Sequence, residues 1–389
     1  MSGLSYLEKL LDGVGVEWKR LGDVADIGTG SSNRQDENEK GIYPFYVRSK
    51  NVLRSDTFQF DETAIVIPGE GGIGDIFHYV EGKYSLHQRA YRICIKLSGL
   101  NTKFIYYFMS SGFKKYILMK KVGATSISIR KPMLEDFQIP IPCPDNPEKS
   151  LAIQSEIVRI LDTFTALTNE LTNELKLRRQ QYNYYREQLL SFKEGEVEWK
   201  RLGEIAEYSK TRISFEQLDE TNYVGVDNLL QNCEGKTQSN YVPKSGNFTE
   251  FREKDILIGN IRPYLRKIWQ ADCAGGTNGD VLVIRCNNNS ISVRYLYQVL
   301  ADGNFFEYNM KYAKGAKMPR GNKEAILKYR IPIPPFNEQI RIITILDKFD
   351  TLTNSISEGL PLEIELRKKQ YEYYRDLLYS FPKPVSADN

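Results

Sequence analysis

The sequence has little of the material from which metal and catalytic centres are usually built. It contains two histidines, His78 and His87, and five cysteines with no CxxC pair among them. A zinc site of the usual spacing cannot be assembled from this set, so we expect no structural metal. An odd number of cysteines without a secretory signal indicates free thiols in a reducing compartment. No apolar run approaches the ~20 residues of a membrane helix, and we expect the protein to be cytoplasmic.

Charge of neither sign is in excess. The 389 residues include 53 Lys and Arg against 50 Asp and Glu, which gives a net charge of +3. So small a charge exerts no strong overall field on polyanions. Any nucleic-acid surface must therefore consist of local basic patches. The length allows two or three domains at roughly 100–200 residues each.

What the sequence does contain is an internal duplication. Between the repeated stretches, residues 28–122 and 209–314 hardly resemble each other. Each half therefore consists of a frame, which is the set of stretches shared by both halves, and an insert that is specific to that half. A common frame suits a pseudo-twofold scaffold or a shared partner, and divergent inserts suit two different targets. The matching stretches are 16–22 with 197–203, 138–142 with 330–334, 160–169 with 345–354, and 181–186 with 370–375.

Two segments have the apolar spacing of long helices. Apolar residues three and four positions apart run through 157–171 and 342–356, and the pattern resumes in 182–192 and 371–381. Such narrow seams predict coiled-coil packing of the two helices against each other. In the first helix Thr-Asn-Glu-Leu occurs twice, over 168–175, which is a stutter in the supercoil. In the second, Gly359 and Pro361 predict a break.

The inserts have the pattern of mixed helices and strands. Short strand-like runs cover 64–67, 90–95, 255–258 and 281–284, helical periodicity covers 103–119 and 293–312, and the Ile-Pro-Ile-Pro stretches are extended. We therefore predict an α/β (α+β) fold with two globular domains separated by two long antiparallel helices. Because residues 7–11 resemble the end of a spacer helix, the organisation is circular. The predicted segments are domain 1–147, spacer helix 148–193, domain 194–336, spacer helix 337–382 and tail 383–389.

Three patterns imitate catalytic motifs and fail on their chemistry. Residues 69–74 match GxGxxG, but a strand-like run follows them in place of a helix, so a hairpin loop is the better interpretation. Asp75 with Glu81 and Lys83 imitates a nuclease triplet of a kind that is common by chance. Residues 333–336 resemble an amino-methyltransferase motif, but Ile at the first position cannot accept a hydrogen bond from a base. We predict that the chain is not an enzyme.

Basic and hydroxyl side chains gather around an equivalent glycine, Gly123 or Gly315, at the end of each insert. Lys, Arg, Ser and Thr in such segments suit phosphate contacts. A solvated surface is the alternative for each of them. The candidates are Lys120, Lys121, Thr125, Ser126, Arg130 and Lys131 in the first half, and Lys314, Lys317 and Arg320 in the second.

Loops that mix donors and acceptors are candidates for base contacts. Arg pairs with guanine, and Asn or Gln with adenine, through bidentate hydrogen bonds worth ~1–3 kcal/mol each. Each single residue also has an ordinary surface role as its alternative. The candidates are Arg48, Lys50, Gln88 and Arg89 in the first insert, and Arg262, Tyr264, Arg266, Asn278 and Asp280 in the second.

Taken together, these features resemble the specificity subunit of type I restriction-modification systems. The resemblance covers nearly the whole chain. It rests on the Val-Glu-Trp-Lys-Arg-Leu-Gly stretch that begins each half, at Val16 and Val197, and on the Ile-Pro-Ile-Pro stretch that ends each insert. It also rests on the Ile-Leu-Asp-x-Phe helices and the Thr-Asn-Glu-Leu tandem. The tandem resembles the subgroup with short repeats in its central conserved region.

The resemblance implies that 1–147 and 194–336 are target recognition domains for a bipartite, asymmetric DNA site. It implies docking of two adenine-methyltransferase subunits and of motor-nuclease subunits on the frame. S-adenosylmethionine, ATP and Mg would belong to those partners, and no cofactor to this chain. Two other classes stay open on the residues alone: a standalone DNA methyltransferase or nuclease, and a coiled-coil interaction protein that does not bind DNA.

Overall fold

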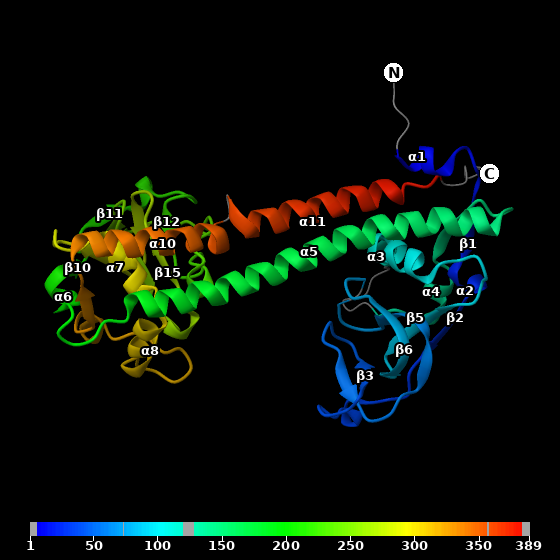
Figure 1. The fold of residues 1–389 in the computed structure, drawn as a ribbon, viewed down its shortest axis with the longest axis horizontal. Coiled ribbons are helices and arrows are strands. Elements are labelled where there is room, and N and C mark those ends of the chain that lie inside the picture. The colour runs from blue at the N-terminus through cyan, green and yellow to red at the C-terminus, as the bar shows by residue number, and fades with distance from the viewer. Residues whose placement is uncertain (1–5, 73, 120–127, 356–357, 383–389) are drawn as a thin grey trace, which may run out of the picture. The chain divides into compact units, whose positions relative to one another are not determined.

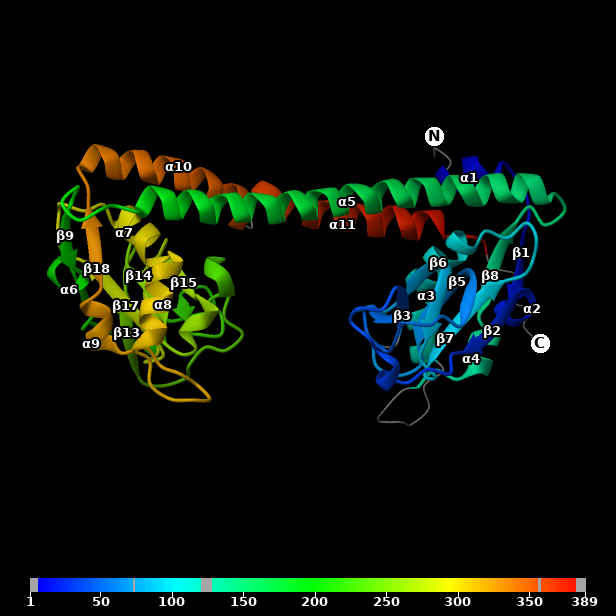
Figure 2. The ribbon, with the colours of Figure 1, turned by 60° about the horizontal axis from the view of Figure 1, so that its bottom comes forward.

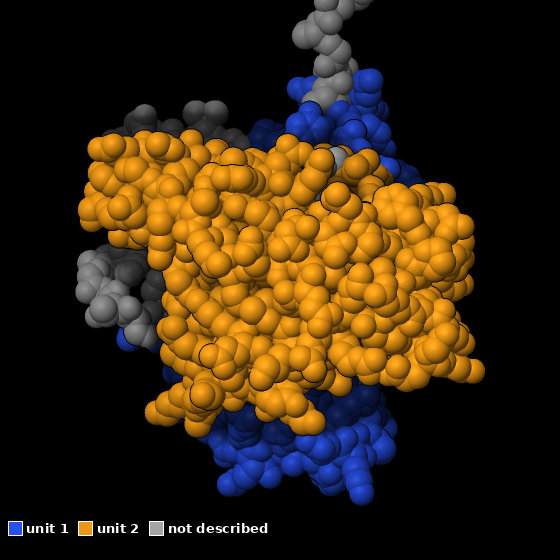
Figure 3. All heavy atoms as spheres, turned by 90° about the vertical axis from the view of Figure 1, so that its left-hand side faces the viewer, with its two compact units in different colours: residues 1–168, 367–389 blue, residues 169–366 orange. Residues whose placement is uncertain are grey.

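The protein is described by a computed structural model that covers residues 6–72, 74–119, 128–355 and 358–382. Its helices and strands are labelled in Figure 1, and Figure 2 gives a second view. The chain divides into two compact units, coloured separately in Figure 3. Unit 1 consists of residues 1–168 and 367–389, and unit 2 of residues 169–366. Both divisions fall inside helices, and the predicted domain boundaries stay predictions.

A six-stranded sheet forms the insert of unit 1, in the order β2-β7-β5-β6-β3-β4. Alternating and continuous apolar residues place Ile65 and Ile93 in its core, fully buried. β5 and β6 form an antiparallel hairpin that encloses the 69–74 pattern, as predicted. The strands are β2 (Ala25–Thr29), β3 (Tyr43–Tyr46), β4 (Leu53–Ser55), β5 (Phe60–Pro68), β6 (His78–Leu86) and β7 (Ala90–Ile95), with the 3-10 turn η1 (Arg34–Asp36).

The insert of unit 2 contains two four-stranded sheets, in the orders β10-β17-β14-β15 and β11-β13-β16-β12. The predicted strand-like runs 255–258 and 281–284 are found as β14 and β17. The strands are β10 (Ala206–Tyr208), β11 (Arg212–Ser214), β12 (Tyr223–Val224), β13 (Asn247–Phe251), β14 (Ile256–Gly259), β15 (Ile268–Gln270), β16 (Gly275–Thr277) and β17 (Val281–Cys286). The 3-10 turns are η2 (Phe215–Gln217), η3 (Gln231–Cys233) and η4 (Pro263–Leu265).

Each insert continues into helix. α3 (Thr102–Met119) is one helix, as its periodicity predicts. The helical periodicity predicted over 293–312 is found as two separate helices, α7 (Val293–Leu300) and α8 (Gly303–Lys311). Asp302 has an extended backbone and its side chain accepts a hydrogen bond from the Asn304 amide at 2.9 Å. This N-cap starts a second helix where the periodicity alone shows no break.

The repeated frame has the same structure in both units. β1 (Val16–Arg20) pairs with β8 (Gln138–Pro142), and β9 (Glu198–Arg201) pairs with β18 (Arg330–Ile333). The short helices α2 (Leu21–Val24) and α6 (Leu202–Ile205) follow, and α4 (Lys131–Glu135) and α9 (Lys323–Leu327) precede the exit strands. A Cβ on Gly22 would lie 2.9 Å from the Glu135 Cβ, and one on Gly203 3.3 Å from the Leu327 Cβ. Glycine at this frame position lets the two short helices touch.

The spacers are helical, and α5 (Pro147–Leu190) is a single helix of 44 residues, green in Figure 1. The second spacer is α10 (Phe336–Asn354) followed by α11 (Gly359–Leu378). The predicted break is therefore confirmed: Ser355 is extended and Gly359 has a φ of +79°. Pro361 lies in the first turn of α11, where its missing N–H leaves no helical hydrogen bond unmade.

The two spacers pack against each other through aromatic pairs at the predicted seam positions. In unit 1 Phe164 stacks on Tyr374 with ring centroids 5.3 Å apart. In unit 2 Tyr182 stacks on Phe349 at 5.9 Å. The first helix, α1 (Tyr6–Leu11), adds Leu7 to the same core cluster as the end of α11. The start and the end of the described chain thus share one core, as the circular organisation predicts.

A repeated aspartate and a repeated glutamine fasten each insert to its spacer helix. In unit 1 Asp162 of α5 accepts hydrogen bonds from Lys103 Nζ at 2.8 Å and Tyr107 Oη at 2.6 Å. Gln154, about two helical turns before Asp162 at ~3.6 residues per turn, accepts a hydrogen bond from the Asn101 amide at 2.8 Å and is fully buried. These bonds hold the start of α3 against α5.

Unit 2 repeats this arrangement with other donors. Asp347 of α10 accepts from Arg294 Nε at 2.7 Å and from Gln298 Nε2 at 2.9 Å. Gln339, also fully buried, accepts from the Ser292 amide at 2.8 Å. The Ile-Leu-Asp-x-Phe repeat in the sequence therefore marks the joint between insert and spacer.

The Arg294 joint gives a test of stability. Arg294→Met removes partly buried hydrogen bonds to Asp347 and Asp350, and each charged hydrogen bond is worth ~1.5–3 kcal/mol. We expect the free energy of unfolding to fall by about 2–4 kcal/mol in urea titrations. Arg341→Met is the matched control, because Arg341 pairs with Glu338 along its own exposed helix face and the loss of this pair should change stability little. If both variants lost the same free energy of unfolding, Arg294 would have no special role in fastening the insert to the spacer helix.

Candidate nucleic-acid interface

In unit 1 the candidate loops meet where the central strands end. The Gly69 amide, just after β5, donates to the Arg89 carbonyl at 2.8 Å. The Ile129 amide donates to the Gly69 carbonyl, also at 2.8 Å. Glu70 and Ser128 form an antiparallel bridge beside them. Three chain segments that are far apart in sequence are thereby fixed side by side.

Unit 2 has the same backbone arrangement at the corresponding strand ends. The Asn260 amide, just after β14, donates to the Asp280 carbonyl at 2.8 Å. The Gly321 amide donates to the Asn260 carbonyl at 3.0 Å, and Ile261 forms an antiparallel bridge with Arg320. The inserts look unrelated in sequence, yet these strand ends are built alike. We call these two groups of loops the strand-end clusters.

The strand-end cluster of unit 1 carries three of the predicted base contacts. Arg48 and Arg89 both donate from Nη1 to the Glu70 Oε2, at 3.1 and 3.0 Å. Gln88 precedes Arg89 in the chain, and its backbone N–H donates to the Ser32 carbonyl at 2.9 Å. Lys50 is exposed in the turn that follows Arg48. Sequence reasoning missed Glu70, because the glycines around it were interpreted only as a hairpin loop.

The strand-end cluster of unit 2 brings together most of the second set. Arg320 Nη1 lies 2.8 Å from Asp280 Oδ1, and Asn278 Oδ1 accepts from the Asp280 amide at 3.0 Å. The Arg262 amide donates to the Pro319 carbonyl at 2.7 Å, which brings the turn η4 to the loop before α9. Tyr264, on that turn, is exposed. The cluster therefore presents a positively charged donor, Arg320, beside a negatively charged acceptor, Asp280.

Arg266 does not join this surface. Its guanidinium lies 5.8 Å from the centroid of the buried Phe306 ring, and its carbonyl accepts from the Cys233 amide at 2.9 Å. The backbone of Arg266 is left-handed, with a φ of +51°. These contacts give Arg266 a structural role in positioning η4, although its base-contact prediction stays untested.

The candidate phosphate contacts are only partly covered by the structure. Lys120, Lys121, Thr125 and Ser126 lie outside the described residues. Arg130 and Lys131 are exposed at the start of α4, and Lys131 also pairs with Glu135 at 3.6 Å. Lys314 and Lys317 are exposed in the corresponding loop of unit 2, where Lys314 forms a backbone bridge with Arg320.

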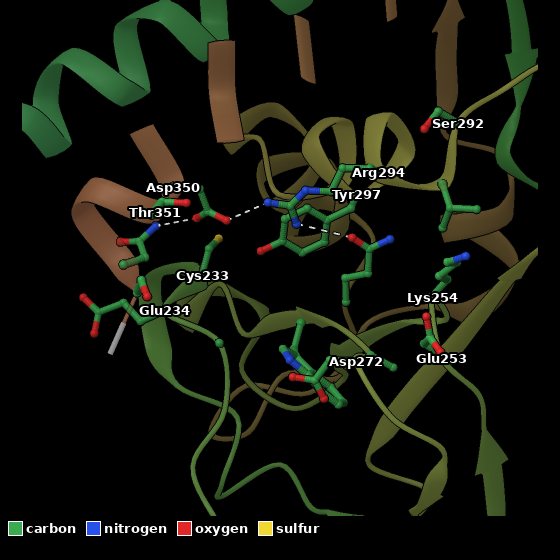
Figure 4. A pocket seen from close by; sticks show the side chains of 17 residues that line it. Cys233, Glu234, Glu253, Lys254, Asp272, Ser292, Arg294, Tyr297, Asp350 and Thr351 are labelled. Atoms are coloured by element: carbon green, nitrogen blue, oxygen red, sulfur yellow. Dashed lines mark hydrogen bonds and ion pairs between the residues drawn. The ribbon is translucent and has the colours of Figure 1, made fainter. Parts of the chain in front are cut away.

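A polar pocket of about 710 Å³ lies elsewhere in unit 2, between α7, α10 and the insert (Figure 4). Arg294 pairs with Asp350 at 2.8 Å in this pocket, and Tyr297 and Cys233 also line it. Burial raises the pKa of the Cys233 thiol to about 11, so the thiolate needed for nucleophilic chemistry is scarce at neutral pH. The pocket walls are the joint between insert and spacer.

Within residues 6–72, 74–119, 128–355 and 358–382, His, Cys, Asp and Glu side chains form no group of three that could hold a metal ion. In the same part of the chain, no helix combines the length and apolar character required to cross a bilayer.

The two histidines predict a pH dependence confined to unit 1. Burial lowers the pKa of both His78 and His87 below the usual value, and His87 Nδ1 accepts a hydrogen bond from the Arg89 amide at 3.0 Å. The unfolded chain, with histidine pKa near ~6.5, then binds more protons than the folded chain as the pH falls below that value. Stability is therefore retained above pH ~6.5 and lost progressively below it.

We expect the melting temperature of the protein to be lower at pH 5.5 than at pH 7.5. The double variant His78→Gln with His87→Gln should have a smaller difference between the two pH values. An undiminished difference in that variant would assign the acid sensitivity to carboxylates instead.

Comparison with known proteins places the chain in a family. The profile of the type I restriction modification DNA specificity domain matches residues 13–178 and again residues 194–366. The specificity subunit of the type I restriction enzyme EcoR124I/EcoR124II of Escherichia coli is 37% identical over 419 aligned residues, covering 100% of both chains. That of the EcoprrI enzyme of Escherichia coli is 34% identical, covering 92% of this chain and 93% of its own length. In fold, the chain resembles the S subunit of a type I restriction-modification system from M. genitalium, with a TM-score of 0.60, 17% identity and coverage of 96% and 98%.

The chain therefore belongs to the family of type I restriction-modification specificity subunits. It is a DNA-recognition subunit and not a catalytic one, which confirms the prediction from the failed motifs. A standalone methyltransferase or nuclease, and a coiled-coil protein without DNA binding, are not favoured.

Proposed function

We propose that this chain recognises a bipartite, asymmetric DNA site, one half with each unit. The observation that carries the proposal is the pair of strand-end clusters. Their backbone hydrogen bonds are the same, while their side chains differ: Arg48, Glu70 and Arg89 in one, Asp280 and Arg320 in the other. An equivalent platform with different donors and acceptors suits two half-sites of different sequence.

The basic loops beside each cluster are proposed to contact phosphates. Arg130 and Lys131 in unit 1, and Lys314 and Lys317 in unit 2, are exposed and lie next to the same bridges that fix the clusters. Phosphate contacts would orient each unit on the duplex without carrying sequence information.

The repeated frame is proposed to dock two adenine-methyltransferase subunits, to which motor-nuclease subunits add. The support is that the frame strands, the Gly22 and Gly203 contacts and the Asp162 and Asp347 joints occur twice. In this proposal S-adenosylmethionine, ATP and Mg belong to the partners, no cofactor belongs to this chain, and the complex works in the cytoplasm. The Thr-Asn-Glu-Leu tandem is proposed to place the chain in the subgroup with short central repeats.

Methylation mapping tests the proposal. The chain would be expressed with its methyltransferase partner in a host without adenine methylation, and the methylated adenines located. We expect one motif with two specific parts and an unread spacer, and no methyl transfer by the purified chain alone. A single continuous motif, or methylation without the partner, would overturn the proposal.

A further inference from the structure

Glu70 holds two arginines with one oxygen. Arg48 follows β3, Arg89 precedes β7, and Glu70 follows β5. Both guanidinium Nη1 atoms donate to the same Oε2, at 3.1 and 3.0 Å. The two Nη1 atoms therefore lie no more than about 6 Å apart. Like charges at that distance repel each other, so the carboxylate is what keeps the two groups together.

Backbone hydrogen bonds anchor the segments that carry this trio. The hydrogen bond from the Gly69 amide to the Arg89 carbonyl fixes Glu70 beside Arg89, and a Cβ at Gly69 would lie 2.9 Å from that carbonyl oxygen. On the other side the His87 amide donates to the Tyr46 carbonyl at 2.9 Å, which fixes the end of β3 that precedes Arg48. The three side chains thus project from three anchored strand ends.

The trio is accessible to a large ligand. The side chains of Arg48, Arg89 and Glu70 are 47%, 54% and 42% exposed. Ion pairs this exposed contribute little to folding, so stability does not explain the arrangement. The Arg89 guanidinium holds the pKa of Glu70 below its usual range, which leaves the carboxylate ionised at neutral pH.

We propose that Glu70 is a specificity-determining positioning residue, which holds Arg48 and Arg89 side by side so that both pair with guanines of the first half-site. Each arginine uses one Nη1 hydrogen on Glu70 and keeps its other donors for the O6 and N7 of a guanine. Base pairs rise ~3.4 Å along a strand, so two groups within about 6 Å reach adjacent or next-adjacent pairs. This inference rests on the proposed function.

The experiment uses the chain in complex with its methyltransferase partner. Methylation mapping first gives the site of the wild type, in which we expect G·C pairs at adjacent or next-adjacent positions of the half-site that changes when residues 28–122 are exchanged. Binding is then measured on duplexes with single base changes. Glu70→Gln should reduce discrimination at those G·C positions by roughly 5- to 150-fold, which is the ~1–3 kcal/mol of a bidentate pair. Discrimination in the other half-site should stay the same.

Two readouts separate positioning from damage to the fold. Glu70→Gln removes a negative charge, so binding to unrelated DNA should be equal or tighter, with an equal or steeper salt dependence, and the melting temperature should be unchanged. Glu39→Gln is the matched control, an exposed carboxylate of the same unit, and should alter no base preference. Asp280→Asn should alter the second half-site alone, through Arg320.

The outcomes are distinguishable. A wild-type complex without a bipartite site would overturn the proposed function and this inference with it. A bipartite site whose first half keeps its full discrimination in Glu70→Gln, or contains no such G·C pairs, would overturn the inference alone. Loss of binding to all sequences with a lowered melting temperature would assign Glu70 a structural role and also overturn it.

Discussion

Exchange of residues 28–122 for the insert of another family member should replace the first half-site completely and leave the second half-site unchanged. The insert of unit 1 has a six-stranded sheet, and one face of that sheet has a core cluster of its own around Val66 and Tyr84. The side chains of Arg48, Glu70 and Arg89 lie within 28–122 and travel with the exchange. Ser128 and Ile129 stay behind, and they contact the cluster only through backbone hydrogen bonds that another insert can also make.

The joint to α5 sets the condition for success. Lys103 and Tyr107 belong to the insert, whereas their acceptor Asp162 belongs to the frame. A donor insert with hydrogen-bond donors at both positions should fold with full stability. A donor insert with apolar residues there leaves Asp162 without these partners, and we expect it to lower the melting temperature by several degrees.

Methylation mapping of the chimaera measures the outcome. A changed first half with an intact second half is the expected result. If both halves changed together, the two units would not recognise DNA separately, and the two-module arrangement would be wrong.

The structural features that could be predicted from the sequence are mainly those that occur in both halves of the chain. The extended Ile-Pro-Ile-Pro segments and the two seams were predicted because each occurs twice, and the break at Gly359 because the second spacer differs from the first at this place. The separation of α7 from α8 was not predicted, because Asp302 acts as an N-cap through one local hydrogen bond inside a continuous apolar pattern.

Single residues of the candidate interface could be chosen from the sequence, but their arrangement in space could not. Arg48, Gln88 and Arg89 were selected by their chemistry, and the structure brings them together. Glu70 could not be found this way, since it is singled out by its hydrogen bonds with Arg48 and Arg89, which lie 22 and 19 positions away in the sequence. The likeness of the two strand-end clusters was also hidden, because it consists of backbone hydrogen bonds that many sequences can make.

The tandem in α5 should act as a ruler for the unread spacer of the DNA site. Thr172–Leu175 lies inside the continuous helix, with Thr172 and Asn173 exposed and Leu171 and Leu175 half-buried. Four residues lengthen a helix by about 6 Å at ~1.5 Å per residue. With a rise of ~3.4 Å per base pair, that corresponds to one or two base pairs if the helix runs along the DNA.

Deletion of Thr172–Leu175 should therefore shorten the spacer by one or two base pairs while both half-site sequences stay the same. Four residues are close to one turn of ~3.6, so the seam stays nearly in phase and folding should survive. The deletion also removes Glu174, which pairs with Arg178 at 2.7 Å on the exposed face, and that loss should cost under ~1 kcal/mol.

Deletion of one or two residues is the control, because it rotates everything beyond it by ~100° or ~200° and should abolish recognition. If Leu171 and Leu175 serve only to fill the seam, the four-residue deletion lowers the melting temperature and leaves the spacer at its original length. Methylation mapping of the deletion variant decides between the two, and an unaltered spacer would reject the ruler.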